Sequence, residues 1–166
     1  MANLAYRDFD QLLKNNYYFA SSSTAASNPP QLPPSHTGIA DSGASGIYFA
    51  SNAPVANLNY SAPAVGVRVA NGLPVSSVAS ATLAATPSLP PAAMQGHVMP
   101  SFPHTLISLG PSADLGCKII FTKTAVSVIH PDGHSILEGW RERDGPRLWR
   151  FPLQPTKPPA NPPTFH

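Results

Sequence analysis

Charged side chains are scarce in this chain. Only 11% of its 166 residues are Asp, Glu, Lys or Arg, whereas roughly 25% are charged in an average globular domain. The formal net charge is +2, and the sequence contains no run of Lys or Arg. The electrostatic footprint of a nucleic-acid-binding protein is therefore missing, and we expect no direct binding to nucleic acid.

Cysteine and long apolar runs are also lacking. The single cysteine, Cys117, excludes a disulfide framework within one chain and zinc sites built from two or more thiolates. No apolar run reaches the ~18 residues that would span a bilayer, and no apolar secretory segment follows Met1. These absences favour a cytoplasmic protein that contacts no membrane.

Proline, in contrast, is abundant. The chain contains 21 prolines, which gather with serine in residues 21–37, 86–103 and 154–166. Because 42% of the residues are hydrophobic, the remainder can still bury a core. We expect an N-terminal helix followed by a disordered linker over 1–37, and a disordered Pro-rich tail over 154–166.

The middle of the chain has the sequence pattern of an all-β protein. Apolar segments of strand length alternate with turn residues, and Asn71-Gly72 is a strong hairpin signal. Residues 86–96 are predicted to form a loop and residues 111–116 one helical turn. Before residue 117 we predict a short apolar strand within 38–52, a strand at 64–70 and its return strand at 73–85. A β-meander comes next, with strands at 117–122, 125–130, 135–142 and 147–153.

Asp41 is the only acidic residue between positions 11 and 113. It stands between the apolar pair Ile39-Ala40 and a glycine turn, so we expect it to be partly buried. Burial of a carboxylate is costly unless it is hydrogen-bonded or shares a proton. Two interpretations remain open on these residues alone: Asp41 caps the backbone of its own turn, or it is a catalytic acid.

A series of motifs surrounds Asp41 in a defined order. Asp-Ser-Gly-Ala-Ser occupies 41–45, Val-Arg-Val-Ala-Asn-Gly occupies 67–72, and a segment ending in Leu-Ile-Ser-Leu-Gly occupies 98–110. Asp-Leu-Gly-Cys-Lys-Ile-Ile-Phe occupies 114–121. This order resembles the aspartic protease segment of copia-type retrotransposon polyproteins, which is retropepsin-like. The resemblance covers about residues 38–153, because residues 121–150 resemble the segment directly downstream of the protease in such polyproteins.

The resemblance implies a retropepsin-like β-barrel protomer over 38–122, continued by a short β-meander over 123–153. It implies an aspartic endopeptidase in which Asp41 and its copy in a second protomer share one proton and activate water. Ser42, Gly43 and Ala44 would support the active-site loop. The partners would be a second copy of the chain and extended peptide segments of its own polyprotein, in the cytoplasm or inside retroelement particles.

Three further segments take roles from the same resemblance. A hairpin with Asn71, Gly72, Leu73 and Val75 is the candidate flap over the substrate. Residues 117–122 match a strand that joins the partner protomer. The apolar segment Leu106, Ile107 and Ser108 would brace the loop of Asp41, although plain core packing explains the same residues.

Two alternatives oppose these assignments. His130 and His134 are four residues apart, a spacing that suits a metal on a helix, but Pro131-Asp132-Gly133 predicts a turn, so we expect no metal and no cofactor. The chain also shows no reverse transcriptase, RNase H or integrase motif and stops at His166. It could therefore be a catalytically inactive β-rich interaction fragment of a decayed retroelement polyprotein.

Overall fold

The computed structural model describes residues 32–85 and 88–155, which lie in one compact unit, 31–166. The expected N-terminal helix and residues 156–166 of the expected tail lie outside the described residues. Part of the expected linker is structured, because Pro34–His36 forms a short 3-10 helix, η1. Thr37 then begins the first strand and is only 2% exposed.

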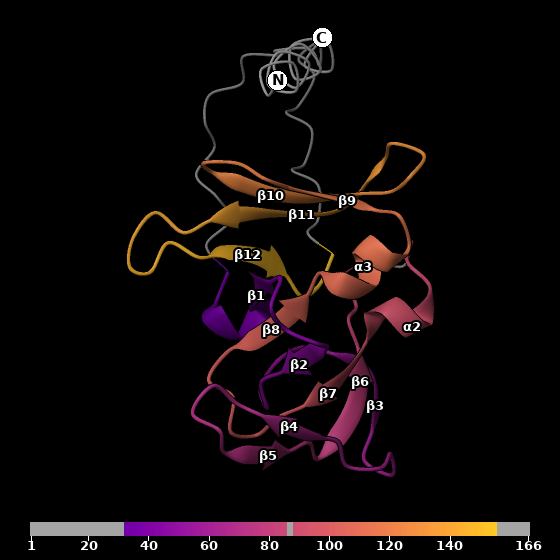
Figure 1. Cartoon of the computed structure of the whole chain (residues 1–166), viewed down its shortest axis with the longest axis vertical. Coiled ribbons are helices and arrows are strands. Elements are labelled where there is room, and N and C mark those ends of the chain that lie inside the picture. The colour runs from indigo at the N-terminus through magenta and orange to yellow at the C-terminus, as the bar shows by residue number, and fades with distance from the viewer. Residues whose placement is uncertain (1–31, 86–87, 156–166) are drawn as a thin grey trace, which may run out of the picture. The chain divides into compact units, whose positions relative to one another are not determined.

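The prediction of an all-β fold is confirmed. Twelve strands run through the described residues, ten of them in one sheet with the order β3-β6-β7-β2-β8-β1-β12-β11-β10-β9 and two in a separate hairpin, β4-β5 (Figure 1). The bounds are β1 Thr37–Asp41, β2 Ile47–Phe49, β3 Ala56–Asn59, β4 Gly66–Arg68, β5 Pro74–Ser76, β6 Ala79–Thr82, β7 Gln95–Val98, β8 Thr105–Ser108, β9 Lys118–Phe121, β10 Ala125–Ile129, β11 Ser135–Arg141 and β12 Trp149–Pro152.

At the centre of the sheet, β8 lies between β1 and β2. It runs parallel to β1, with Ile39 opposite Leu106 and Asp41 opposite Ser108, and antiparallel to β2. The strands β1 and β2 therefore run antiparallel to each other, and β8 is inserted between them. The connection from Asp41 to Ile47 consequently passes the end of β8, which brings two segments distant in sequence together at the acid.

The Asn71-Gly72 signal gives the expected hairpin. The Gly72 amide donates to Val69 O at 2.8 Å, and Gly72 adopts a φ of +83° that a glycine reaches without strain. The predicted return strand 73–85 is wrong as one strand, because the chain changes sheets at Ser77. That buried side chain accepts from the Val65 amide at 2.9 Å, so β5 ends and β6 begins in the main sheet.

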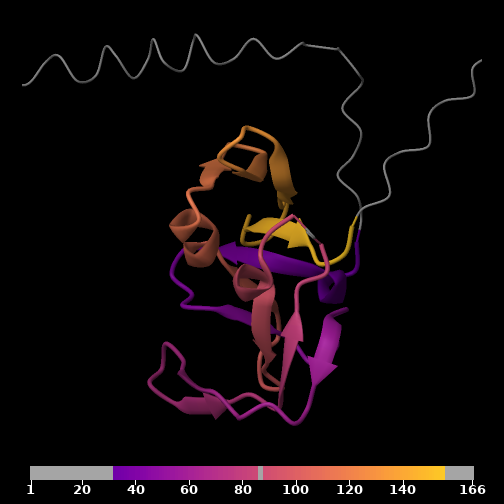
Figure 2. The same cartoon turned by 90° about the vertical axis from the view of Figure 1, so that its right-hand side faces the viewer.

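The meander β9 to β12 forms as predicted. The burial pattern of β10 shows why these residues form strands. Its residues alternate between buried and half-buried, and Val126 and Val128 are each 1% exposed. The last strand, β12, pairs antiparallel with β1, with Phe151 opposite Gly38. The meander is thus continuous with the sheet that carries Asp41. Figure 2 shows β4-β5 at the end of the sheet opposite the meander.

The strands β2, β3 and β7 and one short helix are not predicted by the sequence patterns. The strand β3 pairs with β6, and the helix α2 (Pro91–Met94) lies within the predicted loop 86–96. The helix begins with proline in its first turn, where the missing N–H costs nothing. The predicted helical turn at 111–116 is confirmed as α3 (Gly110–Asp114). Among the described residues, no helix is long and apolar enough to cross a membrane.

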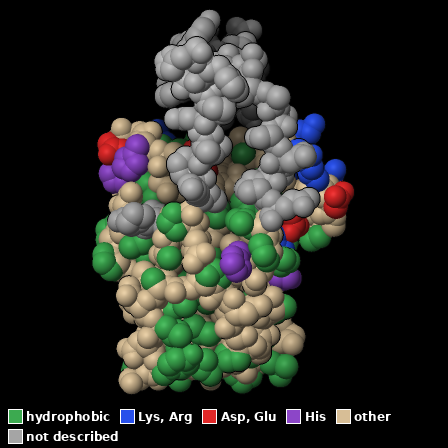
Figure 3. Space-filling view, turned by 180° about the vertical axis from the view of Figure 1, so that it is seen from behind, with side chains coloured by type: hydrophobic (Ala, Val, Ile, Leu, Met, Phe, Trp, Pro, Cys, Tyr) green, Lys and Arg blue, Asp and Glu red, His purple; other side chains and the backbone are tan. Residues whose placement is uncertain are grey.

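The charged residues are unevenly distributed over the surface. On the face that Figure 3 shows, the acidic and basic side chains gather at the end that carries the meander, while the opposite end of this face is apolar and uncharged polar. This agrees with the sequence, in which Asp41 is the only acid between positions 11 and 113. An acid in this part of the chain therefore has few neighbouring charges.

Candidate active site

Asp41 ends β1 and begins a tight turn. Its Oδ1 accepts hydrogen bonds from the backbone amides of Gly43 at 2.7 Å and Ala44 at 3.2 Å. A Cβ on Gly43 would lie 3.3 Å from Oδ1, closer than ordinary van der Waals contact. The carboxylate is half-buried, and these two amides fix its orientation. Its second oxygen accepts no hydrogen bond from the described residues and is available to a water molecule or to another carboxyl group.

The geometry of Asp41 is therefore compatible with both interpretations, the backbone cap and the catalytic acid. The cap of its own backbone is present in the contacts to Gly43 and Ala44. This cap uses only Oδ1, so it positions the carboxylate without exhausting it. The second carboxylate oxygen remains open for the chemistry of a catalytic acid, so both interpretations fit these contacts.

Ser108 at the end of β8 supports the turn. It is 4% exposed, and its hydroxyl donates to Ala44 O at 2.6 Å. The contact joins residues 64 positions apart in the chain. Of the predicted bracing segment, Ser108 thus contacts the Asp41 loop directly. Ile107 is 3% exposed and belongs to the core. For this residue, therefore, the alternative of plain core packing applies.

We expect Ser108→Ala to lower the free energy of unfolding by about 1 kcal/mol, because Ala44 O would lose its partner in a part-buried hydrogen bond. Ser112→Ala is the matched control, since Ser112 is 7% exposed and its hydroxyl makes no hydrogen bond within the described chain. Urea unfolding of both variants measures the difference. Equal destabilisation of the two would show that the Ser108 contact contributes nothing to the turn.

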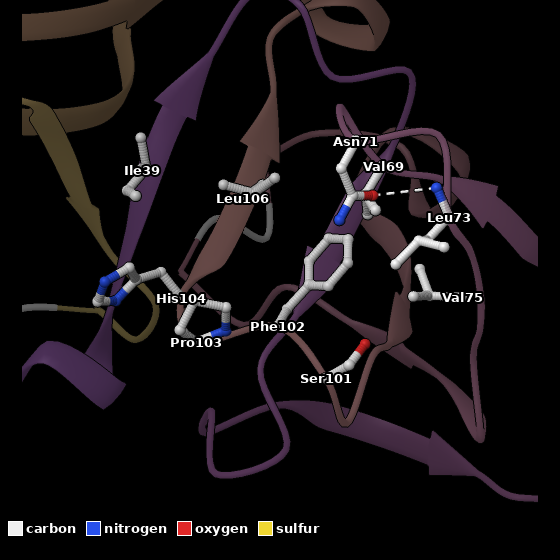
Figure 4. Close-up of a pocket in the computed structure, with 10 residues that line it drawn as sticks. All are labelled: Ile39, Val69, Asn71, Leu73, Val75, Ser101, Phe102, Pro103, His104 and Leu106. Carbon is white, nitrogen blue, oxygen red and sulfur yellow. Dashed lines mark hydrogen bonds between the residues drawn. The ribbon is translucent and has the colours of Figure 1, made fainter.

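A cavity of about 370 Å³ opens beside these strands. Ile39 lies two residues before Asp41 on β1, so the two side chains leave the same face of the strand. Figure 4 shows Phe102 between the side chains of the β4-β5 hairpin and Leu106 of β8. The lining is almost entirely apolar and consists of Ile39, Val69, Asn71, Leu73, Val75, Ser101, Phe102, Pro103, His104 and Leu106.

The candidate flap and the bracing segment are thus brought together. Asn71, Leu73 and Val75 contribute side chains to the cavity wall opposite Leu106, whereas Gly72 forms the turn at the hairpin tip. The side-chain amide oxygen of Asn71 accepts from the Leu73 amide at 3.0 Å and closes the tip. Asp41 itself is not among the residues that line the cavity, so it lies beyond its wall.

Sequence reasoning missed the loop 101–104, which supplies four lining residues. Phe102 packs edge-to-face on Tyr48, with ring centroids 5.8 Å apart. The signal for this loop lies in Pro100 and Pro103, because these prolines keep the segment before β8 out of regular structure. Because β8 runs parallel to β1, the loop 101–104 that precedes β8 lies beside the residues at which β1 begins.

Two other groups of reactive side chains lie outside this site. Cys117 is buried, and desolvation raises the pKa of its thiol, so the nucleophilic thiolate is disfavoured. His130 and His134 do lie at a turn rather than on a helix, as predicted. The turn nevertheless stacks their rings, with centroids 4.8 Å apart.

Comparison of the chain with family models, with curated proteins and with solved structures gave no match.

Proposed function

We propose that the chain is an aspartic endopeptidase of the retropepsin type, active as a homodimer on extended segments of its own polyprotein in the cytoplasm or inside retroelement particles. The observation that carries the proposal is the state of the Asp41 carboxylate. Two amides hold one oxygen, the other has no partner among the residues that the structure describes, and Ser108 of a distant strand supports the turn. These contacts favour a positioned reactive group over a simple cap.

The chemistry needs a second copy of the chain, since the sequence has only one Asp-Ser-Gly-Ala segment. Two facing Asp41 carboxyl groups share one proton, because adjacent like charges do not both ionise. The ionised group takes a proton from water while the protonated group donates to the peptide carbonyl oxygen. The water oxygen bonds to the carbonyl carbon, and the carbon–nitrogen bond then breaks as the nitrogen receives a proton.

The cavity suggests how a substrate is held. An extended peptide would lie between the β4-β5 hairpin and the strands β1 and β8 and would pair through its backbone. One of its side chains would enter the cavity, whose walls include Ile39, Leu73, Phe102 and Leu106. We therefore expect cleavage beside a large apolar residue, because a charged side chain would lose its hydration in a cavity whose lining is mainly apolar.

Two features suit the proposed dimer. Ser42 is exposed, and its hydroxyl makes no hydrogen bond within the described chain, so it can bond to the partner. The strand β9 is an edge of the main sheet and leaves Ile120 41% and Phe121 43% exposed. An exposed apolar edge strand is a ready site for pairing with another chain.

The proposal is tested by incubating the purified full chain with a library of extended peptides and identifying the products by mass spectrometry. We expect cleavage at acidic to neutral pH, inhibition by pepstatin, and a rate per protomer that rises with protein concentration as dimers form. Sedimentation provides the oligomeric state. A chain that stays monomeric, or a dimer that cleaves none of the peptides, would leave the inactive interaction fragment as the better account.

A further inference from the structure

A second cluster of reactive side chains lies at the tip of the β10-β11 hairpin. The His130 amide donates to His134 O at 2.9 Å, and the Gly133 amide donates to His130 O at 2.8 Å. These bonds close the turn over Pro131, Asp132 and Gly133. They also place the two histidines side by side, with their rings 27° from parallel. Nearly parallel stacked imidazoles can direct ring nitrogens toward one common point.

Asp132 lies at that point. Its Oδ2 is 3.0 Å from His130 Nδ1, and its Oδ1 is 2.5 Å from His134 Nδ1. The His134 backbone amide also donates to Oδ1 at 3.0 Å and orients the carboxylate. This backbone hydrogen bond first, and then the contacts to both imidazoles, lower the pKa of Asp132 to about 2.

The three residues offer one ligand atom each, and these atoms all lie within 4.8 Å of one another. Imidazole nitrogens and a carboxylate oxygen bind Zn²⁺ at about 2.0–2.2 Å, which sets neighbouring ligand atoms about 3.3 Å apart in a tetrahedral site. The side chains are 37%, 60% and 49% exposed for His130, Asp132 and His134. Their rotamers can thus adjust by the required ångström without disturbing the core.

We propose that the tip of the β10-β11 hairpin binds one divalent transition-metal ion, with Zn²⁺ as the representative, through His130, Asp132 and His134. The set of two imidazoles and one carboxylate favours borderline metals over Mg²⁺ or Ca²⁺, which prefer all-oxygen sites. Three protein ligands leave at least one position for water. The ion would fasten the end of a hairpin whose turn otherwise depends on exposed contacts.

This site is independent of the proposed protease activity. Its ligands come from the meander, whereas Asp41 and the cavity wall belong to β1, β8 and the β4-β5 hairpin. Figure 3 shows histidine side chains beside an acidic one at the surface of the end that carries the meander. Metal binding should consequently be measurable whether or not the chain cleaves peptides.

The test is calorimetric titration of the full chain with zinc chloride. We expect one saturable site per chain, a rise of the melting temperature with Zn²⁺, and no response to magnesium chloride. His130→Gln and His134→Gln should each weaken zinc binding at least about tenfold. Asp132→Asn should also weaken it, because the amide keeps the hydrogen bond from the His134 backbone but loses the negative charge.

The matched control is His36→Gln, which removes an exposed histidine of the same chain at η1. This variant should bind Zn²⁺ as the unaltered chain does, and the circular dichroism of all variants should agree, since the turn is exposed. In NMR spectra the imidazole signals of His130 and His134 should move on addition of Zn²⁺. No saturable binding, or unchanged binding by both His130→Gln and His134→Gln, would overturn the proposal.

Discussion

Replacing Asp41 by asparagine is expected to abolish peptide hydrolysis while leaving the fold intact. The amide oxygen of asparagine can still accept from the Gly43 and Ala44 amides, which now donate to Oδ1. It cannot take a proton from water or hold the shared proton of a dyad. General acid–base catalysis contributes roughly 10²–10⁴-fold, so we expect kcat/KM to fall at least about 10³-fold because both roles are lost together.

Asp114→Asn is the matched control. This variant makes the same change in charge and size as Asp41→Asn, at an exposed position of α3. Its peptide-cleaving activity should stay within a factor of about two of that of the unaltered chain. Circular dichroism and urea unfolding of both variants separate chemistry from folding. If Asp41→Asn still cleaved the peptide at the normal rate, the catalytic group would have to be another residue. If it unfolded, Asp41 would be a structural cap.

Mixing the unaltered chain with Asp41→Asn chains distinguishes a shared site from a site within one chain. When a dyad needs both carboxyl groups, only dimers of two unaltered chains are active, so activity falls as the square of the unaltered fraction. A site contained in one chain would give a linear decline. The mixture therefore tests the dimeric mechanism separately from the identity of the acid.

The local parts of the site can be predicted from the sequence. Asp41 stands out there as an isolated acid before a glycine turn, and the structure places its carboxylate against the amides of that turn. The hairpin at Asn71-Gly72 depends on two residues that suit its turn. Such features depend on neighbouring residues, so a linear pattern is enough to predict them.

The non-local parts cannot be predicted in this way. The exchange of sheets at Ser77 depends on hydrogen bonds with Val65, and β3 becomes a strand through pairing with β6. The stacking of His130 on His134 arises from hairpin pairing, whereas the sequence pattern addresses only helical spacing. Which strand lies beside which is decided by packing in three dimensions, and no local preference specifies that β12 pairs with β1.

This last pairing leads to the largest expected effect on stability. Phe151→Ala should lower the free energy of unfolding by about 3–5 kcal/mol, because a fully buried ring would be replaced by a cavity. Phe151 is 0% exposed and lies in the core cluster, opposite Gly38 of β1. Since a typical domain is stable by about 5–15 kcal/mol, this single truncation should remove much of the total.

Phe121→Ala is the matched control, because it makes the same truncation on an edge strand where the side chain is 43% exposed. We expect it to cost about 1 kcal/mol or less, and urea unfolding at one protein concentration compares the two. An equal cost would mean that β12 contributes little to the core. A much larger cost for Phe151→Ala would mean that the strand bearing Asp41 is held by a residue 110 positions downstream (151 minus 41). Residues 123–153 would then be part of what positions the acid, and removing them would remove the site.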